Sequence, residues 1–189
     1  MGGNHWVSLK GQLLIAMPGL TDPNFSRSVT CICEHTPAGA VGIVINRIHP
    51  LVSAGEIFNE LNIGCTPEAK LQPVLQGGPV HMGEIFILHG PPFHWEGCMR
   101  ISDTLALSNT RDILESIALG QGPLAFVIAL GCAGWGKDQL ESEILANVWL
   151  TCPLSEELIF TFSLESRWDE AMRTVGVDPA SLSGMAGSA

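Results

Sequence analysis

Short apolar or alternating stretches follow one another along the chain, and this pattern predicts β-strands. The expected strands cover 12–17, 28–34, 41–46, 84–89, 98–101, 104–107, 123–130 and 149–152. The turn formers Thr36-Pro37-Ala38-Gly39 predict that the second and third strands form a hairpin. The stretch 123–130 is the most apolar, so we expect it at the centre of the sheet with both faces covered.

Helical periodicity is interspersed among these strands. Ser53 and Glu56 form a capping box before a short helix, and a second helix is expected from 108–109 to Gly120. A third helix is expected to follow a glycine-rich turn at 131–138. The last long helix should cover 164–175, with an outward pair between Asp169 and Arg173. Strands that cluster early and helices that appear late predict one α+β domain.

Composition agrees with one folded unit. The chain has 189 residues, and 46% of them are hydrophobic while 15% are charged, which excludes disorder as the main state. We expect a single domain over 1–182 and a flexible tail over 183–189, because the tail consists of small residues. The formal net charge of −10 counts against direct nucleic-acid binding and against anionic membranes.

The expected compartment is the cytoplasm. The N-terminus has no cluster of positive charge before its apolar run, and the uncharged stretch 116–136 is interrupted by glycines and Pro123. None of the six cysteines has CxxC spacing, so we interpret them as reduced thiols, with a disulfide framework as the less favoured alternative.

The glycine-rich segment 131–138 has the richest chemistry. It lies between the expected central strand and a helix, where backbone N–H groups can hold an anion. Its spacing matches the first part of a phosphate loop, but Asp138 occupies the position of the magnesium-binding hydroxyl. The alternatives are a tight structural turn, which we favour, and a modest anion or ligand site.

Neighbouring residues each allow two interpretations. A polar stripe at helical spacing is formed by Gln139, Glu143 and Asn147. It is either a solvent-exposed border of the apolar helix face or the wall of a pocket. Cys31, Cys33 and His35 alternate and would share one face of a regular strand, but no fourth ligand is indicated, so no metal is predicted. Arg27 suits a clamp on a carboxylate or phosphate, or a pair with an internal acid that orders its loop.

Several ordered blocks together resemble the AlgH/YqgE-type bacterial proteins. The blocks are Leu14-Ile15-Ala16-Met17-Pro18, 22–29, Cys33-Glu34-His35, 42–47, Gly77-Gly78-Pro79-Val80, Ala133-Gly134-Trp135-Gly136, 139–143 and 147–150. The resemblance implies a cytoplasmic α+β domain with a mixed, strongly curved sheet and flanking helices. It also implies a regulator linked to transcription in some bacteria, with no established catalytic activity. The residues it marks are Asp22, Phe25, Arg27, Glu34, His35, Asn46, Arg47, Trp135, Gln139, Glu141, Glu143 and Asn147. Cys31, Cys132, Lys137 and Asp138 depart from the pattern expected of relatives.

Three functions remain open. The first is a non-catalytic regulatory or interaction protein that needs no cofactor and acts through a protein or small-molecule partner. The second is a sensor or enzyme for a small anion or nucleotide, with its site at the glycine-rich turn. Its candidate ligand-binding residues are Arg27, His35, Arg47, Gly134, Trp135, Gly136, Gln139, Glu143 and Asn147. The least favoured is a metal-dependent hydrolase that uses Asp138 and Glu141, three residues apart on one expected helical face.

Overall fold

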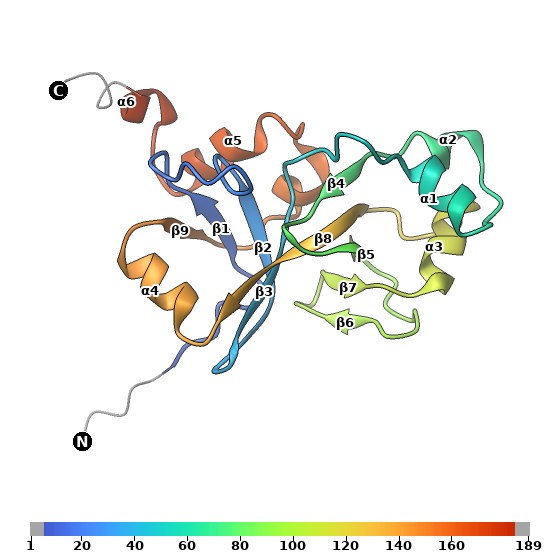
Figure 1. The fold of residues 1–189 in the computed structure, drawn as a ribbon, viewed down its shortest axis with the longest axis horizontal. Coiled ribbons are helices and arrows are strands. Elements are labelled where there is room, and N and C mark those ends of the chain that lie inside the picture. The colour runs from blue at the N-terminus through green and yellow to red at the C-terminus, as the bar shows by residue number, and fades with distance from the viewer. Residues whose placement is uncertain (1–5, 184–189) are drawn as a thin grey trace.

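The fold combines one large sheet with helices around it (Figure 1). The structure is a computed structural model that describes residues 6–183. Its strands are β1 (Leu13–Ala16), β2 (Val29–Thr36), β3 (Gly39–Val44), β4 (Val74–Gln76), β5 (Val80–His89), β6 (Met99–Arg100), β7 (Ala106–Ser108), β8 (Phe126–Gly136) and β9 (Trp149–Cys152). Its helices are α1 (Ala54–Glu60), α2 (Pro67–Lys70), α3 (Arg111–Ala118), α4 (Gln139–Leu145), α5 (Arg167–Thr174) and α6 (Pro179–Ser183), with a π-helical turn η1 (Glu157–Thr161) before α5.

The sheet is mixed and is organised around β8. Within residues 6–183 it has nine strands in the order β6-β7-β5-β8-β3-β2-β1-β9, and β4 pairs with β8 outside this path. The β4–β8 pair is parallel, whereas β8 pairs antiparallel with β3 and β5. In Figure 1, β8 runs through the middle and joins the half that carries β1, β2 and α4 to the half that carries β5, β7 and α3. The predicted α+β class and the central position of this strand are confirmed.

Three apolar clusters hold the sheet and helices together. The first includes Leu13, Cys31 and Ile43 and lies under η1 and α5. The second packs α1, α2 and α3 against β4, β5 and β8. The third lies on the other face of β1, β2 and β3, where Leu140 of α4 packs with Trp135 and Trp149. The third cluster supports the candidate site.

The predicted glycine-rich turn is wrong, because β8 continues through Gly134 and Gly136. These residues pair antiparallel with β3, and Gly39 lies opposite Gly136. Glycine at position 39 makes the close pairing possible: its φ is +141°, and a Cβ there would lie 2.2 Å from the carbonyl oxygen of Trp135. The chain turns only at Lys137 and Asp138, and Asp138 has a left-handed φ of 60°. The strand therefore extends six residues beyond the predicted end at Leu130.

Several local predictions are confirmed. Thr36 ends β2 and Gly39 begins β3, so the hairpin forms where it was expected. The Ser53 side chain accepts from the Glu56 backbone while the Glu56 side chain accepts from the Ser53 backbone, which completes the capping box. None of the helices within residues 6–183 combines the length and the apolar character needed to cross a membrane.

Other details differ from the sequence predictions. The last long helix begins at Arg167 rather than at Leu164, and Arg173 pairs with Glu170 at 2.7 Å instead of with Asp169. Leu145, predicted on the apolar side of its helix, is 84% exposed. Three elements of the structure, β4, α2 and η1, were not predicted from the sequence. Ser183, where the flexible tail was predicted to begin, is the last residue of α6, and the rest of that tail (184–189) lies outside the described residues.

Candidate functional site

A pocket of about 330 Å³ opens beside α4, on the face of the sheet that carries the third cluster. We call it the Trp-Glu pocket. Its lining residues come from the 20–25 loop, β8, α4 and β9: Leu20, Asp22, Phe25, Gly134, Trp135, Gln139, Glu143, Val148 and Trp149. The volume is at the lower end of the range for small-ligand pockets, about 300–1,000 Å³. The pocket therefore has room for a small molecule or for one side chain of a partner.

The Glu143 carboxylate holds the wall of the pocket together. Its Oε2 accepts hydrogen bonds from the indole N–H of Trp135 at 2.9 Å and from that of Trp149 at 2.8 Å. Its Oε1 accepts from the amide nitrogen of Gln139 at 2.9 Å. Gln139 in turn accepts at its Oε1 from the backbone N–H of Gly136, also at 2.9 Å. Two strands and one helix are thus joined through a single carboxylate.

Three aromatic rings meet around this carboxylate. The centroids of Trp135 and Trp149 are 5.9 Å apart at an interplanar angle of 77°. The Phe25 ring lies 5.6 Å from Trp149 and 6.3 Å from Trp135. The two indoles are buried, whereas Phe25 is only half-buried. Phe25 is therefore the most accessible of the three rings.

Arg47 positions the loop that carries Phe25. Its guanidinium donates to the carbonyl oxygen of Pro23 and, at 2.8 Å, to that of Ser26. The carbonyl oxygen of Asp22 accepts from the backbone N–H groups of Phe25 and Ser26, at 3.0 and 2.7 Å. Arg47 was a candidate counter-charge for an anion, but its donors are directed to loop carbonyls.

Arg27 is directed away from the pocket, toward α5. Its Nη2 lies 3.1 Å from a carboxylate oxygen of Asp169, and its guanidinium lies 4.1 Å from the ring centroid of Trp168. Of the two roles considered for Arg27, the structure has the pair with an internal acid. This contact also leaves Arg173 to pair with Glu170 instead of Asp169.

His35 lies in a separate cluster with Glu141 and Trp6, and Glu141 projects from a different face of α4 than Glu143, which is two residues further along the helix. Its Nδ1 accepts from the backbone N–H of Leu9 at 2.9 Å, so the ring proton is on Nε2, which donates to Glu141 at 3.0 Å. The Glu141 carboxylate also accepts from the indole of Trp6 at 3.3 Å. The pKa of Glu141 is lowered, mainly by a hydrogen bond from its own backbone N–H, with smaller contributions from Trp6 and His35. These contacts tie the N-terminal segment to α4.

The predicted shared face of Cys31, Cys33 and His35 is wrong, because β2 contains a bulge. Ile32 pairs with Gly42 and Glu34 with Val41, so the register shifts by one residue at Cys33. His35 consequently pairs with Ala40 on the face of the third cluster, whereas both cysteines lie in the first cluster. The Sγ of Cys33 donates to the carbonyl oxygen of Cys31. The neighbouring Cys31 thiol, together with burial, raises the pKa of Cys33. Within residues 6–183 no group of three or more His, Cys, Asp or Glu residues is arranged to hold a metal ion.

The geometry needed for the hydrolase interpretation also differs from its prediction. Asp138 is in a left-handed conformation before α4, which begins at Gln139, so the helical spacing to Glu141 does not apply. Glu141 itself is occupied by His35 and Trp6.

The predicted site residues thus divide into two groups. Gly134, Trp135, Gln139 and Glu143 line the Trp-Glu pocket. The residues that do not line it are Arg27, His35, Arg47, Gly136 and Asn147. Asn147 is exposed beyond the end of α4, with a left-handed φ of 56°.

The pocket is also lined by residues that were not among the predicted ligand-binding residues, namely Leu20, Asp22, Phe25, Val148 and Trp149. The family resemblance had marked Asp22 and Phe25 without assigning them to a site. For Trp149 the sequence did contain a signal: it lies in the strand predicted over 149–152, and a buried indole N–H requires a hydrogen-bond acceptor. Its partner, Glu143, could not be identified from spacing alone.

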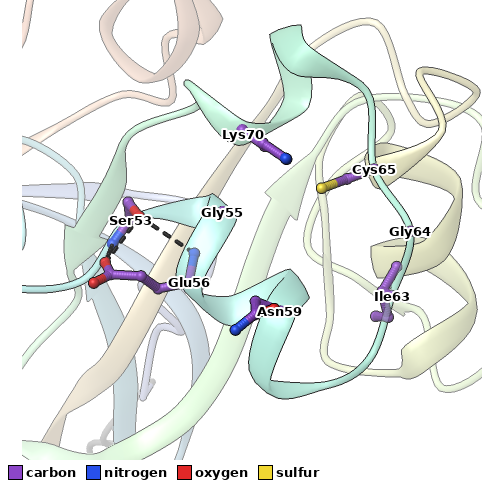
Figure 2. A pocket seen from close by; sticks show the side chains of 8 residues that line it. All are labelled: Ser53, Gly55, Glu56, Asn59, Ile63, Gly64, Cys65 and Lys70. Carbon is purple, nitrogen blue, oxygen red and sulfur yellow. Dashed lines mark hydrogen bonds between the residues drawn. The ribbon is translucent and has the colours of Figure 1, made fainter.

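A larger hollow of about 590 Å³ lies between α1 and α2 (Figure 2). In Figure 2 the side chains of Ser53 and Glu56 are turned toward each other, and Lys70 and Cys65 extend into the space from a different part of its rim. Ser53 and Glu56 are engaged in the capping box of α1, with a Glu56 Oε2 to Ser53 N distance of 2.7 Å. The described residues of its rim include no aromatic side chain and none of the predicted site residues. We therefore take the Trp-Glu pocket as the candidate site.

Hydroxyl and thiol groups next to a histidine occur in a different part of the molecule. His89 is fully buried; its Nδ1 donates to the carbonyl oxygen of Gly90 at 2.7 Å, and its Nε2 accepts from the Ser108 hydroxyl at 2.9 Å. The thiol of Cys98 lies 3.9 Å from the same Nε2. Ser108 is only 1% exposed. His89 is therefore a core histidine with both ring nitrogens hydrogen-bonded, and the Ser108 hydroxyl is too buried to act as a nucleophile.

Comparisons with known proteins agree with the fold and the ordered blocks. A family model described as AlgH-like matches residues 13–180. A UPF0301 protein of Desulforapulum autotrophicum is 51% identical over 169 residues, which cover 89% of each chain. A UPF0301 protein of Jannaschia sp. is 44% identical and covers 96% of this chain and 95% of its own.

Two solved structures are similar to this chain. The solution structure of AlgH from Pseudomonas aeruginosa matches with a TM-score of 0.79 and 36% identity, over 100% of both chains. A crystal structure of a Corynebacterium diphtheriae protein matches with a TM-score of 0.68 over 86% of this chain and 85% of its own, and at 21% identity it supports the fold alone. The family match over most of the sequence, together with these relatives, shows that the chain belongs to the AlgH-like family.

Proposed function

We propose that this protein is a non-catalytic regulatory protein that recognises a small molecule, or a side chain of a partner protein, in the Trp-Glu pocket. The observation that carries this proposal is the Glu143 carboxylate, which accepts three hydrogen bonds and fixes two indoles beside an accessible Phe25. A wall fixed in this way is prepared for binding, because little side-chain freedom remains to be lost.

The chemistry of the pocket supports binding rather than catalysis. The described lining contains no serine, cysteine, histidine or lysine, the usual nucleophiles and bases. Its acidic side chains are Asp22 and Glu143. The three hydrogen bonds that Glu143 accepts hold its carboxylate in place against Trp135, Trp149 and Gln139, which supports a role in shaping the pocket.

Charge supports an indirect regulatory route. With a formal net charge of −10, the protein repels the phosphate backbone, so any effect on transcription would pass through another molecule. We place the protein in the cytoplasm, and its six free cysteines are consistent with that compartment.

The alternative of an anion or nucleotide site at residues 134–136 has less support. Gly134 and Gly136 belong to a paired strand, and the Gly136 amide already donates to Gln139. Arg27 and Arg47, the expected counter-charges, contact Asp169 and the 23–26 loop instead.

Thermal-shift screening would test the binding proposal. The panel should contain small cations, neutral compounds and anions, and the pocket variant should be Phe25→Ala. Phe93→Ala is the matched control, because Phe93 is also half-buried but lies near His89, outside the pocket. A ligand present at 100 times its Kd adds about 2.7 kcal/mol, or roughly 5–10 °C for a chain of this size.

The expected result is at least one compound that stabilises the wild type and Phe93→Ala but not Phe25→Ala. The proposal fails if no compound does so, or if the bound compound is consumed over time. Tight binding of an ordinary DNA duplex at low salt, with a steep salt dependence, would refute the indirect route.

A further inference from the structure

The Trp-Glu pocket is acidic, and its described lining has no basic side chain. The carboxylates of Asp22 and Glu143 contribute two negative charges to one small opening. Neither of them has a basic partner within 4.0 Å among residues 6–183, where the arginine pairs involve Asp103, Glu115, Asp169 and Glu170. The pocket potential therefore attracts a cation and repels a phosphate.

The carboxylate oxygens retain some hydrogen-bonding capacity. Glu143 Oε2 already accepts two bonds, but Oε1 accepts one, from Gln139, so one acceptor position remains there. Asp22 Oδ1 accepts from the backbone N–H of Asn24 at 2.7 Å. Its second oxygen has no hydrogen-bond partner among the described residues, and Asp22 is exposed. A ligand that fills these free acceptor positions on Asp22 and Glu143 must carry hydrogen-bond donors.

The aromatic wall completes a site suited to an organic cation. The face of an aromatic ring attracts a positive group within about 6 Å of its centroid. Phe25 is the most accessible of the three rings and comes from the same loop as Asp22, so a cation next to Phe25 also lies near a carboxylate. Leu20 and Val148 add apolar surface that suits the alkyl part of such a ligand.

We propose that the Trp-Glu pocket binds a small organic cation, an alkylammonium or a guanidinium compound, next to Phe25 and between the carboxylates of Asp22 and Glu143. This inference rests on the proposed function, since it names the ligand class of the same pocket. It goes against the sequence-based alternative of an anion, because the carboxylates face the pocket while the arginines do not.

Three compounds of similar shape can test the charge of the ligand. Protonated 3,3-dimethylbutan-1-amine carries an ammonium group with N–H donors, 3,3-dimethylbutan-1-ol is its neutral analogue, and 3,3-dimethylbutanoate carries a negative charge. Butylguanidinium serves as a second cation. The readout is the indole N–H signals of Trp135 and Trp149 in ¹H–¹⁵N spectra, assigned with Trp135→Phe and Trp149→Phe, because both groups donate to Glu143.

Either cation should shift these two signals in a saturable way, at least tenfold more tightly than the neutral alcohol, and added salt should weaken the binding. Asp22→Asn should weaken it at least threefold, and it keeps the Oδ1 that accepts from Asn24. Glu143→Gln should weaken it further. Glu115→Gln, which removes an exposed charge paired with Arg111 on α3, should change it less than twofold.

Other results overturn the inference. Equal or tighter binding of the alcohol at the same two signals would show that the pocket binds ligands without selecting a cation, which would leave the proposed function intact. Preference for the carboxylate, or no saturable shift with either cation, would also contradict the inference. If Glu143→Gln fails to fold, Asp22→Asn alone decides, and unchanged cation affinity in that variant would contradict the inference. Failure of the proposed function is recognised separately, by a panel in which no compound depends on Phe25.

Discussion

Glu143→Gln is the most informative substitution for testing the pocket wall, because it keeps the shape of the side chain while it alters three hydrogen bonds. In the wild type the bonds have a fixed direction: the Gly136 amide donates to Gln139 Oε1, and Gln139 Nε2 donates to Glu143 Oε1. If the new amide oxygen takes the place of Oε2, both indoles keep an acceptor, but an NH₂ group then faces the NH₂ of Gln139. Rotation of the Gln139 amide relieves this contact only by presenting an NH₂ to the Gly136 amide. One bond is therefore lost in either arrangement.

The magnitude follows from the two kinds of bond. A hydrogen bond to a charged acceptor contributes about 1.5–3 kcal/mol and a neutral one about 0.5–1.5 kcal/mol, so each indole bond weakens by about 1 kcal/mol. The lost bond adds up to about 1 kcal/mol, part of which water restores because Glu143 is half-buried. We expect the free energy of unfolding to fall by about 2–3 kcal/mol.

Urea unfolding at neutral pH, followed by circular dichroism, measures this change. The matched control is Glu115→Gln, which removes the same charge from an exposed pair with Arg111 and should cost less than about 1 kcal/mol. A double-mutant cycle with Trp149→Phe should give a coupling energy of about 1 kcal/mol, since the indole donor is then absent. If Glu143→Gln costs no more than Glu115→Gln, the carboxylate does not hold the pocket wall together.

Three other predictions concern the scaffold. The Thr30 hydroxyl is buried and has no hydrogen-bond partner among the residues that the structure describes, so Thr30→Val should raise the urea-unfolding free energy by about 1 kcal/mol, and a decrease would contradict this account. Burial lowers the pKa of His89, so the unfolded chain binds more protons just below about pH 6.5 and this histidine costs stability as pH falls. Urea unfolding between about pH 7.5 and 5.5 should therefore show a steeper loss for the wild type than for His89→Gln, and parallel curves would contradict the assignment. Gly39→Ala should lower the free energy of unfolding by more than about 2 kcal/mol in the same measurement, because its Cβ would lie 2.2 Å from the Trp135 carbonyl oxygen. The control Gly83→Ala places its Cβ in open space and should cost much less, and equal losses would rule out the contact at Gly39.

The parts of the fold that could be predicted depend on neighbours in sequence. The hairpin at 36–39 and the capping box at Ser53 follow from turn and cap chemistry within four residues, and both are present. The continuation of β8 to Gly136 depends on pairing with β3, almost a hundred residues away, and local glycines favoured a turn there instead. Long-range pairing overrode local propensity at this position.

The site follows the same division. Helical spacing correctly placed Gln139 and Glu143 on one stripe, since this relation needs only the geometry of α4. It could not indicate that the stripe meets Trp149, which follows in another strand. The bulge at Cys33 also has no local signal, and it moved His35 to the face opposite the two cysteines.

Three of the residues marked by the family resemblance, Arg27, Asn46 and Arg47, share one role in the structure, which is to hold the 22–28 loop in place. Asn46 accepts from the Val29 amide and donates to the Arg27 carbonyl, both at 2.8 Å, while Arg47 donates to the carbonyls of Pro23 and Ser26. Arg27 fastens the end of the loop to α5 through Asp169. All three side chains therefore fix the backbone that places Phe25 and Asp22 at the pocket. Arg47 donates to this loop and Arg27 to Asp169, so the charged side chains among the described residues that line the pocket are carboxylates. For this reason we propose an organic cation rather than the anion that the sequence left open as an alternative.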